Sequence, residues 1–362
     1  MKRFLKNVCK ALMCSAMVMS CMTGMAKEKV ILDTDMVESF DDGVAMLMLA
    51  HSPEIELLGV TTVSGNSWVE QGTAYGLRQL ELDGIKNVPL AAGMEYPFRP
   101  QRHADFEQEK AAYGLGYDLW LGSFGLEKPE SWEGFYRAHY KEEPQMKPYN
   151  GHAVNFIIDT IRKNPNEVTI AAIGPCTNLA AAIRMAPDIV PLVKRIVYMG
   201  GSFYQHGNAT PAAEFNWWFD PEATKICIRA PFKDQTILGL DVCEKVVFHK
   251  SDYDRLLKTM ENSPQKDVLR STFVGKSFEG TPGFTHFVWD VLVSAVIIDP
   301  TLITKSVDAY VDINDQVGSS YGQSLAYPLQ APGGTQKCHI VTEVDVERFW
   351  DMLNEKQYWP QR

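Results

Sequence analysis

Acidic and amide side chains stand directly after several short hydrophobic runs of this chain. Asp33 and Asp35 follow the run at 29–32, and the pair Asp41 and Asp42 opens the next helical pattern. Further polar side chains after later runs, or at the start of a later helix, are Asn66, Asn208, Glu214, Asn216 and Asp290. Carboxylates that lie close together repel one another unless they are protonated or neutralised by a cation. If the fold gathers these residues, they would form a cation site.

The residue types in this set indicate which cation it would bind. The side-chain donors are oxygen atoms, and no Cys or His stands at metal-ligand spacing, which favours a hard ion such as calcium or magnesium. Calcium accepts about six to eight oxygen ligands in irregular geometry, which leaves places for a water molecule and for substrate hydroxyls. A carboxylate beside a calcium-bound water could take its proton. The predicted chemistry is therefore metal-assisted hydrolysis.

The order of the predicted elements explains how residues so far apart could meet. Short β-branched runs alternate with helical patterns, which is typical of an α/β fold with an open, mostly parallel, Rossmann-like sheet flanked by helices. We expect strands at 29–32, 55–63, 88–91, 168–173, 195–199, 236–240, 307–313 and 339–344, and helices at 42–51, 74–82, 153–163, 177–185, 221–229, 288–297 and 346–353. In such sheets the ligand crevice lies outside the carboxyl ends of the strands, where the polar residues stand.

The sequence divides into a leader, 1–26, and one predicted catalytic domain, 27–362. In the leader, four basic residues precede an apolar run that ends in small residues, which is typical of a cleaved signal peptide. The run is short for a span of about 20 residues, so we expect an exported protein, periplasmic or secreted, without a stable membrane span. A lipid-modified Cys21 is the alternative. Within the domain, the stretch at about 95–150 has weak periodicity and predicts an irregular, lid-like insertion.

Composition restricts the partners and the redox state. The formal net charge of −10 makes a nucleic-acid polymer or an anionic membrane a poor partner. After the leader, widely spaced cysteines stand at Cys176, Cys227, Cys243 and Cys338. Their spacing favours buried free thiols, although an oxidising compartment would allow a disulfide.

At its polar segments the chain resembles the inosine–uridine-type nucleoside hydrolases. The resemblance runs from about Lys29 to the C-terminus, and only the stretch at 95–150 does not align. It rests on VILDTD…DDGVAMLMLA (30–50), ELLGVTTVSGN (56–66), GHAVNFIID (151–159), IGPCTNLAAAIR (173–184), VYMGGSFYQHGNATPAAEFNWWFDPEA (197–223) and DVLVSAVIIDP (290–300). The resemblance implies an N-glycosyl hydrolase of nucleoside catabolism, which separates ribose from a nucleobase and assembles as a homo-oligomer, a dimer or a tetramer.

The resemblance also implies roles for individual residues. Asp35 resembles a calcium ligand that is also the general base on the calcium-bound water, and Asp42 and Asp290 resemble the other carboxylate ligands. Ile173 stands where the family offers a backbone carbonyl to the ion. Residues that resemble ribose-binding groups are Asp41, Asn66, Glu214 and Asn216, with Met199 and Asn208 as further contributors. The implied reaction passes through an oxocarbenium-like ribosyl transition state, with the sugar diol held by the ion and the growing positive charge stabilised by nearby carboxylates.

Two departures from the family pattern bear on geometry and specificity. Five residues, 36–40, separate Asp35 from Asp41, where the common pattern has three, so the floor of the site would differ. Trp289 precedes Asp290, where many members place a His that protonates the leaving base. Some purine-preferring members carry Trp there, and stacking on an indole favours a purine by contact area. We therefore expect a purine-leaning ribonucleoside hydrolase. A second aromatic wall could come from Tyr113, Tyr117, Trp120 or Trp132, whereas His286 is expected to be a surface or cap histidine.

Two other functions compete with this prediction. The Asp33-Thr34-Asp35 motif after a strand is superficially similar to haloacid-dehalogenase phosphatases, for which Asp241 would be the second acidic residue. The second competing function is non-catalytic binding of a nucleoside or sugar on the same scaffold, because the 36–40 loop and Trp289 are unusual. The presence of Asp35 speaks against a binder, which could have lost it. Release of free base from inosine, guanosine, adenosine or uridine with calcium separates hydrolase from binder.

Overall fold

The computed structural model describes residues 26–38, 41–112 and 121–360. The predicted leader, except Ala26, lies outside these ranges, and so do three of the aromatic candidates for the second wall, Tyr113, Tyr117 and Trp120. Within the described ranges, no helix has both the length and the apolar character that a bilayer span requires. The cysteines of these ranges are buried free thiols, as their spacing predicts: Cys176, Cys227, Cys243 and Cys338.

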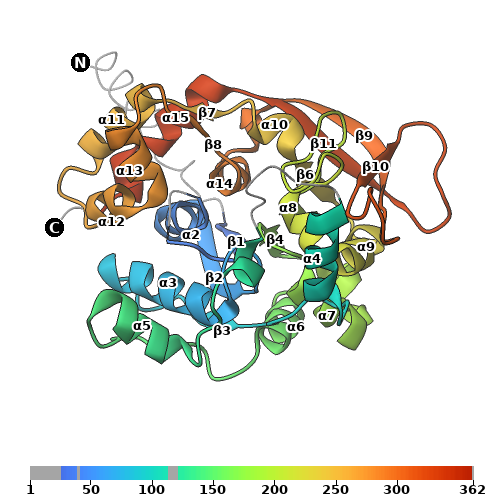
Figure 1. Ribbon diagram of the computed structural model, residues 1–362, viewed down its shortest axis with the longest axis horizontal. Coiled ribbons are helices and arrows are strands. Elements are labelled where there is room, and N and C mark those ends of the chain that lie inside the picture. Colours follow the sequence, from blue (N-terminus) through green and yellow to red (C-terminus); the bar gives the residue numbers. More distant parts are fainter. Residues whose placement is uncertain (1–25, 39–40, 113–120, 361–362) are drawn as a thin grey trace, which may run out of the picture.

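A mixed sheet of nine strands forms the centre of the described part of the chain, in the order β10-β9-β11-β6-β5-β4-β1-β2-β3 (Figure 1). Its strands are β1 (Glu28–Thr34), β2 (Ile55–Thr62), β3 (Leu90–Ala92), β4 (Val168–Ala172), β5 (Arg195–Met199), β6 (Gln235–Leu238), β9 (Ile303–Ile313), β10 (Ser324–Tyr327) and β11 (Gln336–Val344). The neighbours from β3 through to β11 pair in parallel, and only β9 is antiparallel to both of its neighbours, β10 and β11. The predicted open, mostly parallel α/β fold is confirmed.

Helices cover both faces of this sheet because the side chains of its strands alternate in direction. Val30 and Leu32 of β1 pack into the cluster of α2, α3 and α14, while Ile31 between them packs into the cluster of α6, α7 and α9. Figure 1 shows these two groups of helices on opposite sides of the strands. The bounds of the helices that bear on the site are α2 (Asp42–His51), α3 (Val69–Leu82), α6 (Ala153–Lys163), α7 (Thr177–Met185), α8 (Phe215–Phe219), α9 (Pro221–Arg229) and α14 (Asp290–Ile298).

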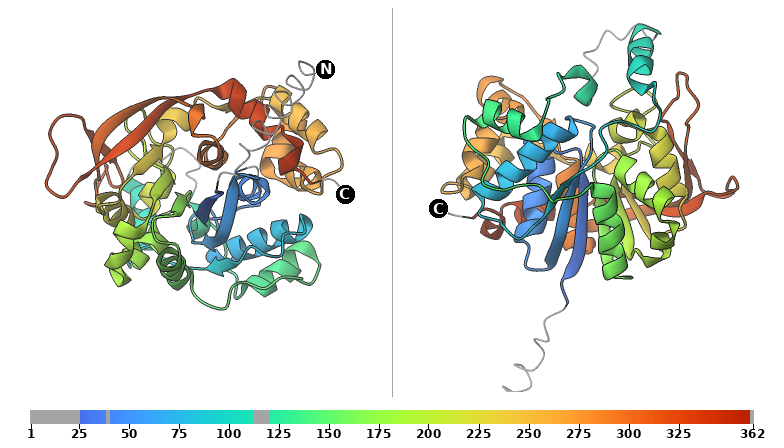
Figure 2. Two further views of the ribbon diagram at one scale, coloured as in Figure 1. Left: turned by 180° about the vertical axis from the view of Figure 1, so that it is seen from behind. Right: turned by 90° about the horizontal axis from the view of Figure 1, so that it is seen from below.

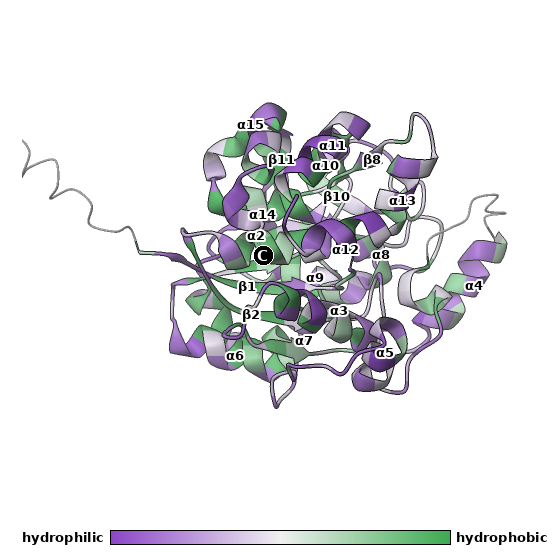
Figure 3. Cartoon of the chain, turned by 90° about the vertical axis from the view of Figure 1, so that its left-hand side faces the viewer, coloured by the Kyte–Doolittle hydropathy of each residue, from purple (hydrophilic) through white to green (hydrophobic). Residues whose placement is uncertain are grey.

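The two helices α2 and α14 are apolar around their whole circumference and lie in the interior (Figure 3). They pack against each other, and the Ser294 hydroxyl of α14 donates to the carbonyl of Ala45 in α2 (3.0 Å). A helix that is hydrophobic on all sides is stable only when it is buried. Burial of this pair brings their first residues, Asp42 and Asp290, to the same end of the sheet.

Some elements differ from those predicted. The helix expected at 74–82 is α3, which begins at Val69 because the Gln71 side chain accepts from the Trp68 amide (3.0 Å) and stabilises an earlier first turn. Elements that lie outside the prediction include β10, α8, α10 (Leu240–Cys243), α11 (Lys250–Thr259), α12 (Gln265–Ser271), α13 (Phe273–Gly280) and the hairpin of β7 (Val247–Phe248) with β8 (His286–Phe287). The closing helix, α15 (Val346–Leu353), lies where it was expected.

The stretch at 95–150 contains more regular structure than its weak periodicity predicts. Its described residues include α4 (Arg102–Ala112), the 3-10 helix η1 (Gly122–Gly125) and α5 (Trp132–Tyr140). In the right-hand view of Figure 2, the teal α4 lies at the end of the molecule opposite to the start of the blue β1. The stretch therefore extends beyond the carboxyl ends of the parallel strands, which is the end that carries the predicted site.

A buried arginine fastens α4 to the helix α8. Arg102 is 1% exposed, and its guanidinium donates to Glu109 Oε1 (2.7 Å) and to the carbonyls of Trp218 (2.7 Å) and Phe219 (3.3 Å). The Trp218 indole N–H donates to the other oxygen of Glu109 (2.8 Å), and the guanidinium carbon lies 4.2 Å from the ring centre of Phe106. Each buried charge is thus compensated by a specific partner.

Removal of Arg102 should therefore destabilise the protein strongly. In Arg102→Ala the buried Glu109 loses its countercharge, and breaking a buried pair costs about 3–5 kcal/mol. Urea denaturation measures this loss as a lower midpoint. The control is Arg162→Ala, which removes the exposed ion pair with Asp188 and should leave the midpoint nearly unchanged. Equal losses in the two variants would show that Arg102 does not hold α4 in place.

Candidate active site

The predicted site residues meet at the carboxyl ends of the parallel strands. Asp35 directly follows β1, Ile173 directly follows β4, and Met199 is the last residue of β5. Asp42 and Asp290 are the first residues of α2 and α14. The topology therefore brings the segment 35–42 and three segments distant from it to one end of the sheet, as the strand-end rule predicts.

Asp35 is fully buried and tightly surrounded. Its Oδ2 accepts a hydrogen bond from the Asn66 backbone amide (2.6 Å), whereas its Oδ1 has no partner among the described residues. A Cβ atom on Gly65 would lie only 2.3 Å from Oδ2, so only glycine fits beside this carboxylate. A buried oxygen without a partner is costly, which makes Oδ1 a candidate ligand atom.

Asp42 lies beside Asp35 and shares its environment. Its Oδ1 accepts from the Thr34 hydroxyl, and its buried Oδ2 has no partner among the described residues. Burial raises the pKa of Asp42 to about 6, although the hydrogen bond from Thr34 acts in the opposite direction. Burial, together with the charge of Asp42, raises the pKa of Asp35 well above its ordinary value. The two carboxylates therefore cannot both be ionised without a compensating positive charge.

Asp290 belongs to the same electrostatic cluster. It is 3% exposed, and burial raises its pKa well above the ordinary value. The charges of Asp41, Asp42 and Asp35 raise that pKa further, and Glu214 adds a smaller effect in the same direction. The carboxylates that were predicted to share an ion therefore do repel one another in the folded chain.

Asp41 connects the two central helices at this point. Its Oδ1 accepts from the backbone amide of Asp290, the first residue of α14 (2.8 Å). Burial and the charge of Asp42 raise the pKa of Asp41 to about 8, and hydrogen bonds from backbone amides at the start of α14 oppose this rise. In this structure Asp41 thus caps α14 and fixes the position of Asp290.

Glu214 and Asn216 form the opposite side of the site. Glu214 caps α8, because its carboxylate accepts from the backbone amides of Asn216 (2.7 Å), Trp217 (3.1 Å) and Gly201 (2.9 Å). Burial raises the pKa of Glu214 to about 7, and these three hydrogen bonds limit the rise.

The side chain of Asn216 ties together the ends of two strands. Its Nδ2 donates to the carbonyls of Ile173 (3.0 Å) and Met199 (3.3 Å), which end β4 and β5. Its Oδ1 is buried without a partner among the described residues. Asn216 therefore holds the Ile173 carbonyl, the predicted backbone ligand, in place. The Oδ1 of Asn216 stays available as a hydrogen-bond acceptor.

Asn66 and Asn208 lie at the margin of this cluster. Asn66 is half-buried and contributes its backbone amide to Asp35. Asn208 is exposed, and its Oδ1 accepts from the Phe215 amide (2.9 Å), which supports the loop that leads into α8. The side chain of Asn208 thus has a structural contact here in addition to the ribose-binding role that the resemblance implies.

Trp289 adjoins the cluster, and His286 lies against it. The ring centres of Trp289 and His286 are 5.1 Å apart at 80°, and the Trp289 Nε1 is buried without a partner among the described residues. Burial lowers the pKa of His286, whose Nδ1 is paired with the Phe287 carbonyl (2.8 Å). The lowered pKa disfavours the protonated form that a leaving-group acid would need. Trp132 instead lines a pocket with Val69 and Thr73 of α3.

The beginning of the 36–40 loop is anchored at two points. The buried Met36 accepts from the Ser67 hydroxyl at its carbonyl (2.8 Å), and Glu38 pairs with His139 of α5 (3.4 Å). Residues 39 and 40 lie outside the described ranges. The described half of this loop is thus held by α5 and by the turn after β2.

The phosphatase alternative does not agree with the structure. Asp33 accepts from the Thr61 hydroxyl (2.6 Å) and the Asn178 amide (2.8 Å), and Asp241 accepts from the backbone amides of Phe203 (2.9 Å) and Tyr204 (2.7 Å). These carboxylates serve separate structural purposes and do not form a paired magnesium site. The expectation that Asp33 joins the others at the mouth is wrong, because its carboxylate is engaged by β2 and α7.

The donor set fits a hard cation in its chemistry. Among the described residues, no group of three or more acidic, His or Cys side chains is arranged so that it could hold a metal ion. The cluster does present three buried oxygens that lack partners in this part of the chain, namely Asp35 Oδ1, Asp42 Oδ2 and Asn216 Oδ1. Oxygen donors of this kind suit calcium or magnesium.

Some residues that shape this site have weak sequence signals. Thr34, which donates to Asp42, stands between the two aspartates of the motif, and Gly65 precedes Asn66. The only sequence signal that points to Thr34 and Gly65 is that each is adjacent in sequence to a predicted site residue.

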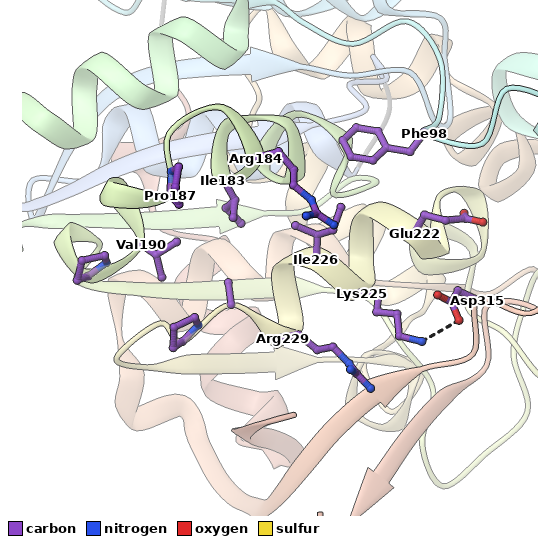
Figure 4. Close-up of a pocket in the computed structure, with 13 residues that line it drawn as sticks. Phe98, Ile183, Arg184, Pro187, Val190, Glu222, Lys225, Ile226, Arg229 and Asp315 are labelled. Carbon is purple, nitrogen blue, oxygen red and sulfur yellow. Dashed lines mark hydrogen bonds and ion pairs between the residues drawn. The ribbon is translucent and has the colours of Figure 1, made fainter. Parts of the chain in front are cut away.

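A separate surface cavity of about 1050 Å³ lies between α7, α9 and the 3-10 helix η2 (Pro187–Leu192). Figure 4 shows its charged rim, where Lys225 pairs with Asp315 (2.7 Å). Its lining includes none of the predicted site residues, so the chemistry is assigned to the carboxylate cluster.

Comparison with known proteins agrees with this geometry. The model of the inosine-uridine preferring nucleoside hydrolase family matches residues 30–351. The pyrimidine-specific ribonucleoside hydrolase RihB of Escherichia coli O1:K1 / APEC is 30% identical over 337 residues, which cover 91% of this chain and 97% of the relative. This chain therefore belongs to the inosine-uridine preferring nucleoside hydrolase family. It is an enzyme that hydrolyses the N-glycosidic bond of nucleosides, and the non-catalytic alternative is set aside.

Solved structures confirm the fold. A purine-preferring ribonucleoside hydrolase from Gardnerella vaginalis is similar with a TM-score of 0.72 and 27% identity, over 91% of this chain and 98% of that one. The plant nucleoside hydrolase PpNRh1 is similar with a TM-score of 0.74 and 25% identity, over 92% of this chain and 99% of that one.

The raised pKa values predict that the metal-free protein loses stability as the pH rises. A folded carboxyl with a raised pKa holds a proton that the unfolded chain releases near pH 4. Its stabilising effect is therefore present below that pH and disappears through the folded pKa values, about 6 for Asp42, 7 for Glu214 and 8 for Asp41. With a chelator present, the Tm should fall between pH 5 and pH 8.

The control for this measurement is Asp42→Asn, which removes one charge of the cluster and should give a smaller fall over the same range. A Tm that stays constant or rises with pH in the chelated wild-type protein would contradict the assignment.

Proposed function

We propose that this nucleoside hydrolase binds one calcium ion through the carboxylates of Asp35, Asp42 and Asp290 and the backbone carbonyl of Ile173. The proposal is supported above all by the burial of Asp35 beside Asp42, with one oxygen of each lacking a partner among the described residues. Calcium, when bound, would neutralise the cluster and orient the 2′- and 3′-hydroxyls of the ribose. Without such a charge, the cluster must retain protons near neutral pH.

The side chains around the cluster would then bind the sugar. Asn216 Oδ1 is a hydrogen-bond acceptor without a partner in the described part of the chain, and a ribose hydroxyl would satisfy it. The carboxylate of Glu214, fixed by three backbone amides, would accept from another hydroxyl. The other groups that we assign to the sugar are Asp41, Asn66, Met199 and Asn208. Binding of a fixed sugar supplies the orientation that the reaction needs.

Asp35 would act as the general base. Its carboxylate takes a proton from the attacking water, whose oxygen forms a bond to C1′ while the bond from C1′ to the base nitrogen breaks. The electron pair of the broken bond goes to the nucleobase nitrogen, and the departing nucleobase then takes up a proton from solvent. Neighbouring carboxylates stabilise the positive charge that grows on the ribose ring in the transition state.

Replacement of Asp35 should remove turnover while leaving the fold intact. Asp35→Asn keeps the size of the side chain but cannot accept the proton, and loss of a general base lowers kcat about 10²- to 10⁴-fold. Release of free base from inosine measures this rate. The matched control is Asp33→Asn, which alters a buried aspartate two residues earlier and should retain turnover, because Asn can still accept from Thr61 and Asn178. Near-normal turnover in Asp35→Asn would remove it from the role of base.

For the base, we propose a preference for purines through stacking on Trp289. The relatives differ on this point, since RihB is named pyrimidine-specific and the Gardnerella vaginalis enzyme is named purine-preferring. The support comes from Trp289 itself, which adjoins Asp290 and keeps its indole N–H unpaired within the described ranges. A purine has a larger face than a pyrimidine, so it gains more from an aromatic platform.

The preference can be measured as kcat/KM for inosine and guanosine against uridine. Purines should be the better substrates, and Trp289→Ala should lower kcat/KM for purines about tenfold more than for uridine, since stacking of one base contributes about 1–3 kcal/mol. Trp132→Ala serves as the control and should leave the ratio unchanged. A wild-type preference for uridine would overturn the role of Trp289 as a base platform.

Localisation and assembly remain predictions. The composition of the leader supports export to the periplasm or the exterior, and the resemblance to the family supports a dimer or a tetramer.

A further inference from the structure

The insertion at 95–150 contacts the catalytic turn directly through η1. The backbone amide of Ser123 donates to the carbonyl of Gly65 (2.7 Å), immediately before Asn66. At the other end of η1, the Trp68 indole N–H donates to the Leu126 carbonyl (3.0 Å). The turn after β2 is therefore held from both sides by one short segment that is distant from it in sequence.

Gly122 makes this contact possible. Its φ of +55° lies in the left-handed region, and a Cβ there would stand 2.1 Å from the Gly65 carbonyl oxygen and 2.7 Å from the ring of Phe215. The carbonyl is a backbone atom and cannot move aside as the end of a flexible side chain can. Any residue other than glycine must therefore push η1 and this turn apart.

The turn in its own right holds Asp35. Asn66 donates its amide to Asp35 Oδ2 (2.6 Å), and Gly65 approaches the same oxygen so closely that no Cβ fits between them. Displacement of Gly65 would therefore move the Asn66 amide, which donates to Asp35. On the other side of Gly122, Phe215 stands between Glu214 and Asn216 in α8 and its cap. Gly122 thus lies between the turn that holds Asp35 and the ring of Phe215, the residue between Glu214 and Asn216.

The aromatic residues around η1 keep it in this position. Phe124 of η1 is 9% exposed and stacks on Phe219 with ring centres 5.0 Å apart, and it meets Trp68 edge-on at 5.6 Å. These rings belong to one buried cluster that also includes Phe106 of α4 and Phe215. Aromatic contacts of this kind add to the gain from burial, so η1 is a fixed support.

We propose that Gly122 and Ser123 are positioning residues, which set the distance between the Asp35 side and the Glu214–Asn216 side of the active site. This inference rests on the proposed function of Asp35, and it assigns part of the insertion at 95–150 to the catalytic scaffold. The two residues act through their backbone, and neither side chain is required to touch the substrate.

Gly122→Ala tests this role. A small misplacement of a catalytic group lowers the rate by up to about 10²-fold, so we expect kcat for inosine to fall between about 10- and 100-fold, with a smaller change in KM. Gly122→Asn, which tolerates a left-handed backbone better but still carries a Cβ, should show the same defect. It provides the test if the alanine variant does not fold.

Two glycines provide matched controls. Gly84 has a similar φ of +69° but nothing within 4 Å of its Cβ position, so Gly84→Ala introduces the backbone strain without the contact. Gly125→Ala alters η1 at a place where only the Leu121 side chain lies near, at 3.4 Å. Both controls should keep kcat within about twofold of the wild-type value. An equal fall in kcat for Gly84→Ala and Gly122→Ala would overturn the proposal.

Hydrogen–deuterium exchange provides a readout that does not depend on activity. In Gly122→Ala, the amides of residues 64–68 should exchange faster than in wild-type protein, and in Gly84→Ala they should not. Unchanged exchange and unchanged kcat in Gly122→Ala would refute the positioning role. Failure of the proposed function has a different signature, which is full turnover in Asp35→Asn while the exchange of residues 64–68 still responds to Gly122→Ala.

Discussion

The structure depends on one electrostatic constraint, the burial of several carboxylates at the same end of a parallel sheet. Asp35, Asp42 and Asp290 are each at most 3% exposed. The charge of Asp42 raises the pKa of Asp35, and the charges of both raise the pKa of Asp290. The fold offsets part of the cost of burying these charges with the positive ends of helix dipoles. Asp42 and Asp290 begin α2 and α14, Glu214 caps α8, and the partial positive charge at a helix N-terminus stabilises a nearby carboxylate. Within the described ranges, three buried side-chain oxygens of the site still lack a hydrogen-bond partner. A hard cation and a sugar diol would satisfy them.

Much of this arrangement follows from the sequence, and the parts that do not follow have physical reasons. Short β-branched runs that alternate with helical patterns, together with the strand-end rule, suffice to predict the sheet and to bring Asp35, Asp42 and Asp290 together. The strand-end rule fails for Asp33, because it takes account only of the position at the end of a strand. The carboxylate of Asp33 accepts hydrogen bonds from Thr61 of β2 and Asn178 of α7, which the rule does not consider. The rule also gives no information on the contact of Asp41 with Asp290, which spans 249 positions. The helices of the stretch at 95–150 are stabilised by tertiary contacts such as those of Arg102, and local periodicity is therefore weak there.

The proposed catalytic residues and the individual features of this chain occupy different parts of the fold. The carboxylates and Asn216 come from strand ends and helix starts of the sheet, whose arrangement is shared with solved nucleoside hydrolases. Trp289, the 36–40 loop and the stretch at 95–150 stand around that centre. Relatives named for opposite base preferences match 91% of this chain, one in sequence and one in structure. The differences that select a base are therefore expected in these surrounding segments. Because η1 also contacts the turn that holds Asp35, a change in this segment would alter rate and specificity together.

A calorimetric titration of the chelator-treated protein with calcium, in two buffers of different ionisation enthalpy near pH 6.5, tests the central claim most directly. Carboxylates that retain protons in the metal-free state must release them when a cation binds. The account predicts one saturable site per chain, with proton release that is visible as a difference in heat between the buffers, and loss of that site in Asp42→Asn. Absence of saturable binding, or binding without any proton release, would contradict it.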